Sequence, residues 1–533
     1  MLLLAVSSWS CGGRPATAAT PGVSNHAAAR PDSEPAPRYA LAAGSTRLLG
    51  TLRTTLVIDA YVTKGWPEVD GFVADLTDLL RAYARGSRGK LEFRLIVVDT
   101  PGQRELASQA GLQEQVFSSG EAEPRSATSQ GFMGLVFKYR DEKTVIPQLL
   151  LESQGLEFWV TNKIREIRDR ADGVSRRIGV VSGKGELRLS DAYLAPRKSS
   201  GAAGPTLQGI MGQAFPFYRF EDVLLGRGAI DPQLAGLIIT QPEQDYSDAE
   251  LRRIDEFLML GEKSLVVYAS AVNVRAGDST LVGRLSTHRL DQLLDGYGIH
   301  MNRDAVFDYG AQFRVQVVYS SGEKLWLRHC GLPLALSDAE ARPEQQLLDP
   351  GFAGFFRMEE LIFPFASSLE LTRDRQPTDV LLKAVARSTA SAAVESADEV
   401  DLNLRQEWRP KPPLEQRILA AYAQGKLKSA FAAKLGADAA TPTRARKSSR
   451  VLVISSSLFL ANPFVYADNG PPNTSAGDPQ LLALAQPYTK YLTSTILSFK
   501  NALDWISNDD DLIALSATLV SKRPVPRSTN PKD

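Results

Sequence analysis

The stretch RRIGVVSGKGELRL, residues 176–189, decides the fold of this chain. Its apolar run at residues 178–181 breaks at glycine-flanked Lys184, which is typical of a buried strand that runs into a tight turn. A phosphate-binding P-loop would need a hydroxyl after the lysine to hold magnesium, but Gly185 and Glu186 follow Lys184. The dinucleotide pattern also fails, because Arg188 replaces its third glycine. We therefore predict a turn that leaves a parallel strand, and no nucleotide site.

Strands and helices alternate before this stretch. Residues 52–62 (LRTTLVIDAYV) and 90–100 (KLEFRLIVVDT) are typical of strands, with a helical pattern at 69–87 between them. A hairpin around Arg140 and an amphipathic helix from residue 156 complete the order β-α-β-α-β-β-α, the order of thioredoxin-like domains. Redox thioredoxins place a Cys-x-x-Cys at the start of the first helix. Residues 61–70 (YVTKGWPEVD) contain no cysteine, which excludes dithiol chemistry.

The alternation continues after the opening stretch. Apolar strand patterns recur at residues 235–242, 263–270 and 450–463, and Ser247 and Glu250 have the spacing of a capping box that starts a helix. Strands alternating with helices favour a mostly parallel, doubly wound sheet. The fold class predicted is therefore α/β: a thioredoxin-like domain followed by a flavodoxin-like doubly wound domain with a β-rich insertion.

These patterns divide the chain into successive segments. Residues 1–47 form a signal-like or lipoprotein-like segment with a Pro/Ala/Ser-rich tether, and residues 48–172 form the thioredoxin-like domain. Residues 173–304 begin the flavodoxin-like domain, 305–440 form the β-rich insertion with loops, and 441–533 return a strand and the C-terminal helices.

Composition limits the function. The chain of 533 residues is 43% hydrophobic, and its 61 basic residues equal its 61 acidic ones. A zero net charge argues against a nucleic-acid binder, which needs basic residues to displace counterions. The four histidines and two cysteines show no metal-ligand spacing, and no nucleophile, base and oxyanion donor come together. We predict no catalytic residues, no metal and no cofactor, and hence no enzyme.

The first residues resemble a bacterial lipoprotein signal. The apolar run at residues 2–6 precedes Cys11, which is the candidate lipidation site, although no basic residue comes before the run. A misassigned start or the remainder of a longer membrane segment are the alternatives. We expect membrane association through this N-terminus.

The candidate ligand or partner loops lie where parallel strands end. In open α/β sheets, ligands bind in the crevice at the carboxyl ends of the strands. Two predicted strands end in polar loops, so an anion or a glycan group is the ligand alternative to a purely structural turn. The residues are Ser182, Gly183, Lys184, Gly185, Glu186, Gln241, Glu243 and Gln244.

The order of these pieces resembles the Gldg family, auxiliary components of ABC-type transport systems first named for gliding motility. The matching blocks include RIGVVSGKGE (177–186), LDQLLDGYGIHMNRDAVFD (290–308) and RVLVISSSLFLANP (450–463), and the resemblance spans roughly residues 38–524. It implies an extracytoplasmic domain beside an ABC permease and ATPase, and a second half similar to a domain of an intraflagellar-transport protein. Family members carry transmembrane helices at both ends, and this sequence shows at most a stub of the first.

The function predicted is a non-catalytic extracytoplasmic accessory subunit of an ABC-type transport system. Its partners would be the permease and ATPase subunits, and its location the periplasm-facing cell envelope, anchored to the membrane. The alternative is a periplasmic binding protein for a polysaccharide or peptidoglycan fragment at the strand-end loops. A hydrolase with a carboxylate pair is a third alternative.

Overall fold

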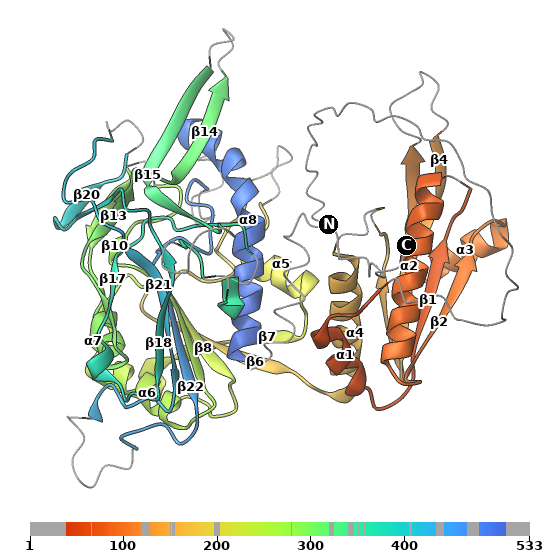
Figure 1. Ribbon diagram of the computed structural model, residues 1–533, viewed down its shortest axis with the longest axis horizontal. Coiled ribbons are helices and arrows are strands. Elements are labelled where there is room, and N and C mark those ends of the chain that lie inside the picture. Colours follow the sequence, from red (N-terminus) through yellow and green to blue (C-terminus); the bar gives the residue numbers. More distant parts are fainter. Residues whose placement is uncertain are drawn as a thin grey trace, which may run out of the picture.

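The computed structural model describes residues 39–65, 67–118, 128–149, 151, 155–196, 203–278, 280–318, 324–338, 346–349, 351–355, 358–403, 408–432, 442–465 and 479–507. The chain is a mixed α/β protein, as predicted, and its two largest sheets lie in two separate bodies (Figure 1). The candidate lipidation site Cys11 lies outside the described residues.

The first sheet is built around one central strand. β1 (Leu56–Val62) pairs in parallel with β2 (Leu91–Val97) and antiparallel with the long β4 (Thr128–Tyr139). β3 (Glu114–Ser118) and β5 (Glu142–Ile146) both pair with β4. The predicted hairpin between β4 and β5 is confirmed, and Arg140 in its turn has φ 52°. The strand β3 was not predicted.

Helices cover both faces of this sheet. α1 (Ala43–Gly50), α2 (Pro67–Gly86) and α4 (Leu156–Asp172) share one apolar core with the central strands, while Ala107 of α3 (Pro101–Gln109) belongs to a smaller core with Phe132 and Val136 of β4. α3 begins with a capping box: the Thr100 side chain accepts a hydrogen bond from the Gln103 backbone amide, and the Gln103 side chain accepts one from the Thr100 amide.

The second sheet has nine strands and two kinds of pairing. Its parallel part has the order β7-β6-β8-β9-β22, and antiparallel strands β21, β17, β12 and β18 extend it past β22. The parallel strands are β6 (Arg176–Ser182), β7 (Tyr218–Leu224), β8 (Gly236–Thr240), β9 (Ser264–Tyr268) and β22 (Ser449–Ile454). The antiparallel ones are β12 (Ile299–Met301), β17 (Leu369–Leu371), β18 (Leu381–Arg387) and β21 (Ile418–Gly425).

Both faces of the nine-stranded sheet are covered. α6 (Asp248–Met259) and α7 (Leu290–Gly296) share a core with one face, and α5 (Leu207–Ala214) and α8 (Pro479–Ile506) share a core with the other. The predicted capping box is confirmed, since Ser247 accepts from the Glu250 backbone and Glu250 accepts in return. Cover on two faces explains why every residue of β8 and β9 is buried and why their central residues are apolar.

Further strands form small sheets around the main one. β14 (Gln312–Val318), β15 (Lys324–Leu336) and β16 (Glu360–Ile362) form one sheet, and β13 (Ala305–Asp308) pairs with β19 (Ala392–Glu395). β10 (Val272–Asn273), β11 (Val282–Leu285) and β20 (Glu399–Asp401) form a third. Short 3-10 turns η1 (Leu225–Arg227), η2 (Ala353–Phe355) and η3 (Arg373–Arg375) complete the described elements.

The two bodies meet where α4 lies beside α8, and the contact contains buried charges. Arg165 of α4 donates to Asp504 of α8 at 3.0 Å, and the Lys500 ammonium lies 2.6 Å from the other oxygen of that carboxylate. All three side chains are fully buried. Tyr218 of β7 also donates to Asp504, and the Arg165 guanidinium lies 4.2 Å from the ring centroid of Phe217. Although burial opposes ionisation, the charges of Lys500 and Arg165 hold the pKa of Asp504 below its usual value.

A buried histidine lies under the small β14–β15–β16 sheet. The His329 ring contacts Leu402 O at 2.9 Å through Nε2, and its Nδ1 accepts from the Gly331 amide at 3.2 Å. Since Nδ1 accepts, the neutral ring with a proton on Nε2 fits this site. Burial lowers the pKa of His329 from 6.5 to about 4.

This histidine gives the protein a pH-dependent term in its stability. The unfolded chain protonates His329 below about pH 6.5 and the folded chain only near pH 4. The contribution is therefore complete above pH 6.5 and falls as the pH drops towards 4, by about 3 kcal/mol. We expect His329→Gln to remove that part of the slope in urea unfolding measured from pH 7 to 4.

The control for this experiment is Leu332→Ala, on the same strand and fully buried. It should lower the free energy of unfolding at every pH without changing the slope, because it removes no titratable group. Equal slopes for wild type and His329→Gln would contradict the assignment.

Candidate functional site

The structure brings the two predicted strand-end loops together. The loop after β6 (residues 182–186) and the loop after β8 (residues 241–244) pair through their backbones. The Leu187 amide donates to Gln241 O at 3.1 Å, and the Glu243 amide donates to Lys184 O at 2.9 Å. The Thr240 hydroxyl also donates to Leu187 O at 2.7 Å. The loops therefore form one ordered unit at the carboxyl edge of the parallel strands.

Two glycines allow this close approach. Gly183 and Gly185 have φ values of 113° and 77°, which glycine adopts without strain. A Cβ on Gly185 would lie 2.9 Å from Cβ of Glu243, closer than two carbon atoms can pack. The Gly-Lys-Gly pattern thus serves the meeting of two backbones.

The charged side chains of the first loop are already paired. The Lys184 ammonium lies 3.1 Å from a carboxylate oxygen of Glu250, the residue that caps α6. Glu186 accepts from the Tyr246 hydroxyl and from the Lys184 amide, both at 2.7 Å. Burial, and then the Glu186 charge, raise the pKa of Tyr246 well above its usual value, so this hydroxyl stays a donor.

Glu250 is held as a carboxylate. Burial alone would raise its pKa, but hydrogen bonds from Ser247 and Lys184 outweigh it and lower the pKa of Glu250 below its usual value. The lysine that would meet a phosphate in a P-loop is therefore engaged with a permanent negative charge.

A second polar network lies beneath the other loop. The buried Gln241 side chain donates through Nε2 to Asn273 Oδ1 at 2.7 Å. Its Oε1 accepts from the Ser270 backbone amide at 2.9 Å. The Asn273 amide nitrogen donates to three backbone carbonyls, which fixes its oxygen as the acceptor. His288 reaches that oxygen through Nε2 at 2.8 Å and Asp245 through Nδ1 at 3.0 Å. Both contacts are donations when both ring nitrogens carry a proton.

The outer rim of the site is exposed and polar. Glu243 makes a two-bonded ion pair with Arg275, with both contacts at 2.9 Å, and its side chain is 47% exposed. Gln244 and Asp245 are exposed beside it, and Ser182 is half-buried at the end of β6. An exposed row of this kind suits contact with a partner surface better than enclosure of a small molecule.

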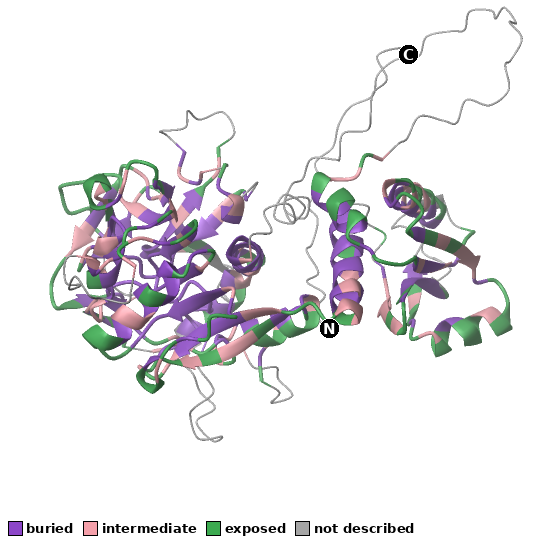
Figure 2. Ribbon diagram, turned by 90° about the horizontal axis from the view of Figure 1, so that it is seen from below, coloured by how far each residue is buried: buried purple, intermediate pink, exposed green. Residues whose placement is uncertain are grey.

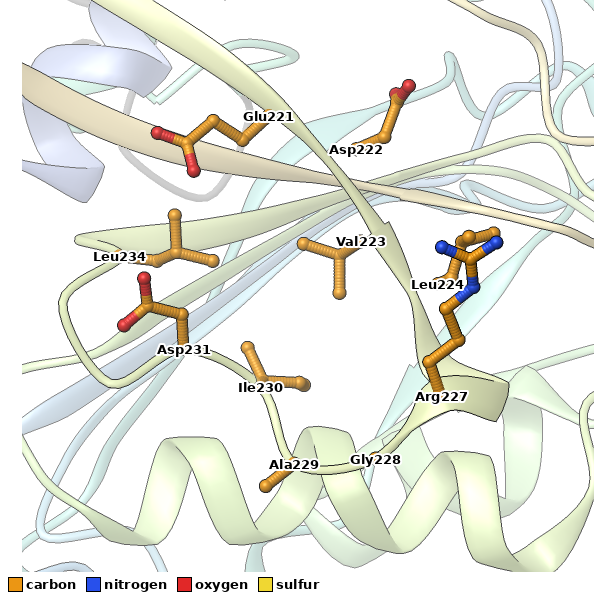
Figure 3. Close-up of a pocket in the computed structure, with 10 residues that line it drawn as sticks. All are labelled: Glu221, Asp222, Val223, Leu224, Arg227, Gly228, Ala229, Ile230, Asp231 and Leu234. Atoms are coloured by element: carbon orange, nitrogen blue, oxygen red, sulfur yellow. The ribbon is translucent and has the colours of Figure 1, made fainter.

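An open pocket lies beside these loops along the edge strand β7. It has a volume of about 190 Å³ and is lined by residues 221–224, 227–231 and 234 (Figure 3). Val223 and Ile230 turn towards its centre, and Glu221 and Asp231 stand on its rim. Both carboxylates are paired with Arg177, at 2.6 and 2.7 Å. This arginine lowers the pKa of Glu221, and the Gln233 amide together with Arg177 lowers the pKa of Asp231.

The described residues contain no group of three or more histidine, cysteine or acidic side chains arranged to hold a metal ion. Within the same residues, no helix combines the length and hydrophobicity needed to cross a bilayer.

Several residues of this site could not be identified from the sequence. Four residues outside the two loops complete the networks, and each comes from another part of the sequence. They are Tyr246, Asn273, Arg275 and His288. The only signal was position, because Tyr246 directly precedes the capping box and Asn273 follows β9 by a few residues.

Comparison with protein families identifies the second body. Residues 175–484 match the model of the ABC transport auxiliary family, described as an ABC-type uncharacterized transport system. The chain belongs to this family. Membership agrees with the resemblance to the Gldg-type auxiliary components and supports an accessory role in an ABC transport system. Residues 36–138 match a domain of unknown function (DUF7088).

A solved structure titled "mmIFT52 N-terminal domain" is similar at 12% identity, with 60% of this chain and 97% of that chain covered and a TM-score of 0.29. A comparison with curated proteins gave no match.

The packing of the two loops can be tested at Gly185. We expect Gly185→Ala to lower the free energy of unfolding by about 3 kcal/mol, since it adds backbone strain and a clash with Glu243. Gly173→Ala is the matched control: its φ is 68°, but nothing lies within 4 Å of the added Cβ. It should cost only about 1 kcal/mol of strain. If the two variants lose the same free energy of unfolding in urea, the close packing of Gly185 against Glu243 is contradicted.

Proposed function

We propose that this protein is a non-catalytic, extracytoplasmic accessory subunit of an ABC-type transport system that docks with a permease and ATPase pair. The observation that carries the proposal is the family match over residues 175–484, which includes every parallel strand of the second sheet. Family membership supports association with ABC transporter subunits, and the docking partners and the location are the proposed part.

The strand orders support the two predicted domain types. The second sheet has the order β7-β6-β8-β9-β22, which is 2-1-3-4-5 in chain order, the flavodoxin-like arrangement. In the first body, β2-β1-β4-β5 has one parallel pair followed by antiparallel ones, as in a thioredoxin-like sheet. Both types are common scaffolds for many functions, so the function rests on the family and the site.

The site supports docking over chemistry. A general base or nucleophile needs a side chain free to reach a substrate, whereas Lys184, Glu186 and Gln241 are each engaged with neighbours. The exposed Glu243, Gln244 and Asp245 form a rigid polar rim on the paired loops. We propose this rim as one contact with the transporter subunits.

The proposed location is the periplasm-facing cell envelope, with a lipid on Cys11 as the anchor. We expect the wild-type protein to stay with membranes through a carbonate wash and Cys11→Ala to be released by that wash. Export of both must be checked by protease accessibility in spheroplasts. A Cys11→Ala protein that stays membrane-bound after a carbonate wash would contradict lipid anchoring.

The docking proposal is tested by co-purification. When this chain is tagged and expressed with the permease and ATPase encoded beside it, all three should be recovered together from mild detergent. The double variant Glu243→Arg/Gln244→Arg should reduce recovery at least tenfold, because it reverses the charge of the rim. Asp374→Arg, an exposed charge reversal on η3, is the control and should not reduce it.

Two results would contradict the proposal. If the tagged chain is folded and neither subunit is recovered with it, the proposed docking with the transporter is contradicted. Saturable binding of peptidoglycan or polysaccharide fragments in calorimetry, lost in the same rim variant, would favour the binding-protein alternative.

A further inference from the structure

A two-stranded ribbon extends from the second body. It consists of β14 and the first half of β15, and it rises beyond the rest of the fold at the top of Figure 1. Its base is firmly held. Phe313 is buried with its ring centroid 5.6 to 6.0 Å from those of Phe464, Tyr488 and Tyr491, the last two on α8. The base of the ribbon is therefore fixed to the fold.

One face of the ribbon carries exposed aromatic and basic side chains. Trp326 is 64% exposed, the largest exposed fraction among the large hydrophobic side chains of the described residues. Arg314 and Arg328 are exposed too. In the antiparallel register Arg314 is opposite Arg328, and Trp326 is two residues further along β15. Side chains two apart on a strand point to the same face, so all three share it.

The arginine pair is unfavourable for the protein alone. Like charges directly opposite each other in an antiparallel pair repel and destabilise the sheet. Among the described residues, neither arginine has an acidic group within ion-pair distance. An anion that binds between the two guanidinium groups would remove the repulsion and accept hydrogen bonds from both.

We propose that this face binds the anionic phospholipid headgroups of a membrane surface. The arginines would contact headgroup phosphates, and the Trp326 ring would enter the interface, where its apolar ring and its N–H are both accommodated. The partner is a bilayer with anionic lipid, identified by the phosphate that the arginine pair fits and the apolar layer that the tryptophan fits.

The spacing along the ribbon agrees with the layers of a bilayer. Strands rise about 3.4 Å per residue, so Trp326 lies about 7 Å beyond the arginine pair, towards the outer end of the ribbon. Interfacial side chains are buried about 5–10 Å into the boundary between headgroups and acyl chains. A ribbon that meets the surface with this face, tilted towards its outer end, therefore places the guanidinium groups at phosphate level when the indole reaches that boundary. An acidic protein surface would satisfy the arginines but would leave the indole without an apolar partner.

The test is co-sedimentation of the purified full chain with vesicles in the absence of any transporter subunit. We expect binding to phosphatidylglycerol vesicles, weak binding to phosphatidylcholine vesicles, and loss of the difference at high salt. Arg314→Gln/Arg328→Gln should weaken the partition onto phosphatidylglycerol roughly thirtyfold, from about 1 kcal/mol per basic residue. Trp326→Thr should remove the quenching of tryptophan emission by brominated lipid, while the arginine contacts remain.

Matched controls separate this face from general effects. Arg219→Gln/Arg284→Gln removes the same charge from exposed positions on β7 and β11, and Leu381→Thr removes an apolar side chain that is 49% exposed on β18. Both should bind like the wild type, and all variants should keep its thermal midpoint. Inorganic phosphate at millimolar concentration should not compete with the vesicles if the bilayer is the ligand.

Three outcomes would overturn the inference: equal binding to neutral and anionic vesicles, unchanged binding of the arginine double variant, or binding only to vesicles that contain the permease. The inference goes beyond the proposed docking role, and its test needs no transporter subunit. A failed co-purification and a failed vesicle experiment are therefore distinguishable.

Discussion

The buried charges between α4 and α8 are the constraint on which the arrangement of this molecule depends. An aspartate, a lysine and an arginine, all fully buried, are stable only together, because each would otherwise be an unpaired charge in an apolar medium. Arg165 belongs to the helix that closes the first sheet, and Lys500 and Asp504 belong to the helix that covers the second. Separating the two bodies would expose these charges to water or leave them without an ion-pair partner. The junction therefore fixes one relative position of the two sheets, and Figure 2 shows that buried residues occur in both bodies.

A fixed frame matters because the proposed contacts lie on different parts of the second body. The paired loops after β6 and β8 present Glu243 and Gln244 at one edge of the sheet, and the β14–β15 ribbon presents Trp326 elsewhere. α8 connects the ribbon with the junction. Its Tyr488 and Tyr491 hold the base of the ribbon through Phe313, and its C-terminal end reaches the junction. An accessory subunit that contacts both protein and lipid needs such rigidity, since flexible contacts lose binding free energy to ordering.

The sequence predicted what local patterns determine and missed what only tertiary contacts determine. Apolar runs gave the parallel strands, and the Ser247–Glu250 spacing gave the start of α6, because both signals are contained in a few neighbouring residues. The sequence did not predict β3, because apolar and polar residues do not alternate clearly in its five residues and Val116 is exposed. The candidate loops were found from strand ends, but the pairing of Lys184 with Glu250 joins residues far apart in the chain. Local spacing patterns cannot reveal a pair so far apart in the sequence. The same is true of Arg165 and Asp504.

A double-mutant cycle on Arg165 and Asp504 tests the role of the junction most directly. Urea unfolding of Arg165→Met, Asp504→Leu and the double variant would give the coupling free energy between the two side chains. We expect Asp504→Leu alone to lower the free energy of unfolding by about 3–5 kcal/mol. The loss in the double variant should be smaller than the sum of the two single losses by more than about 1 kcal/mol. Additive losses within about 0.5 kcal/mol, or an α4 that exchanges its amide hydrogens independently of α8, would contradict this role of the junction.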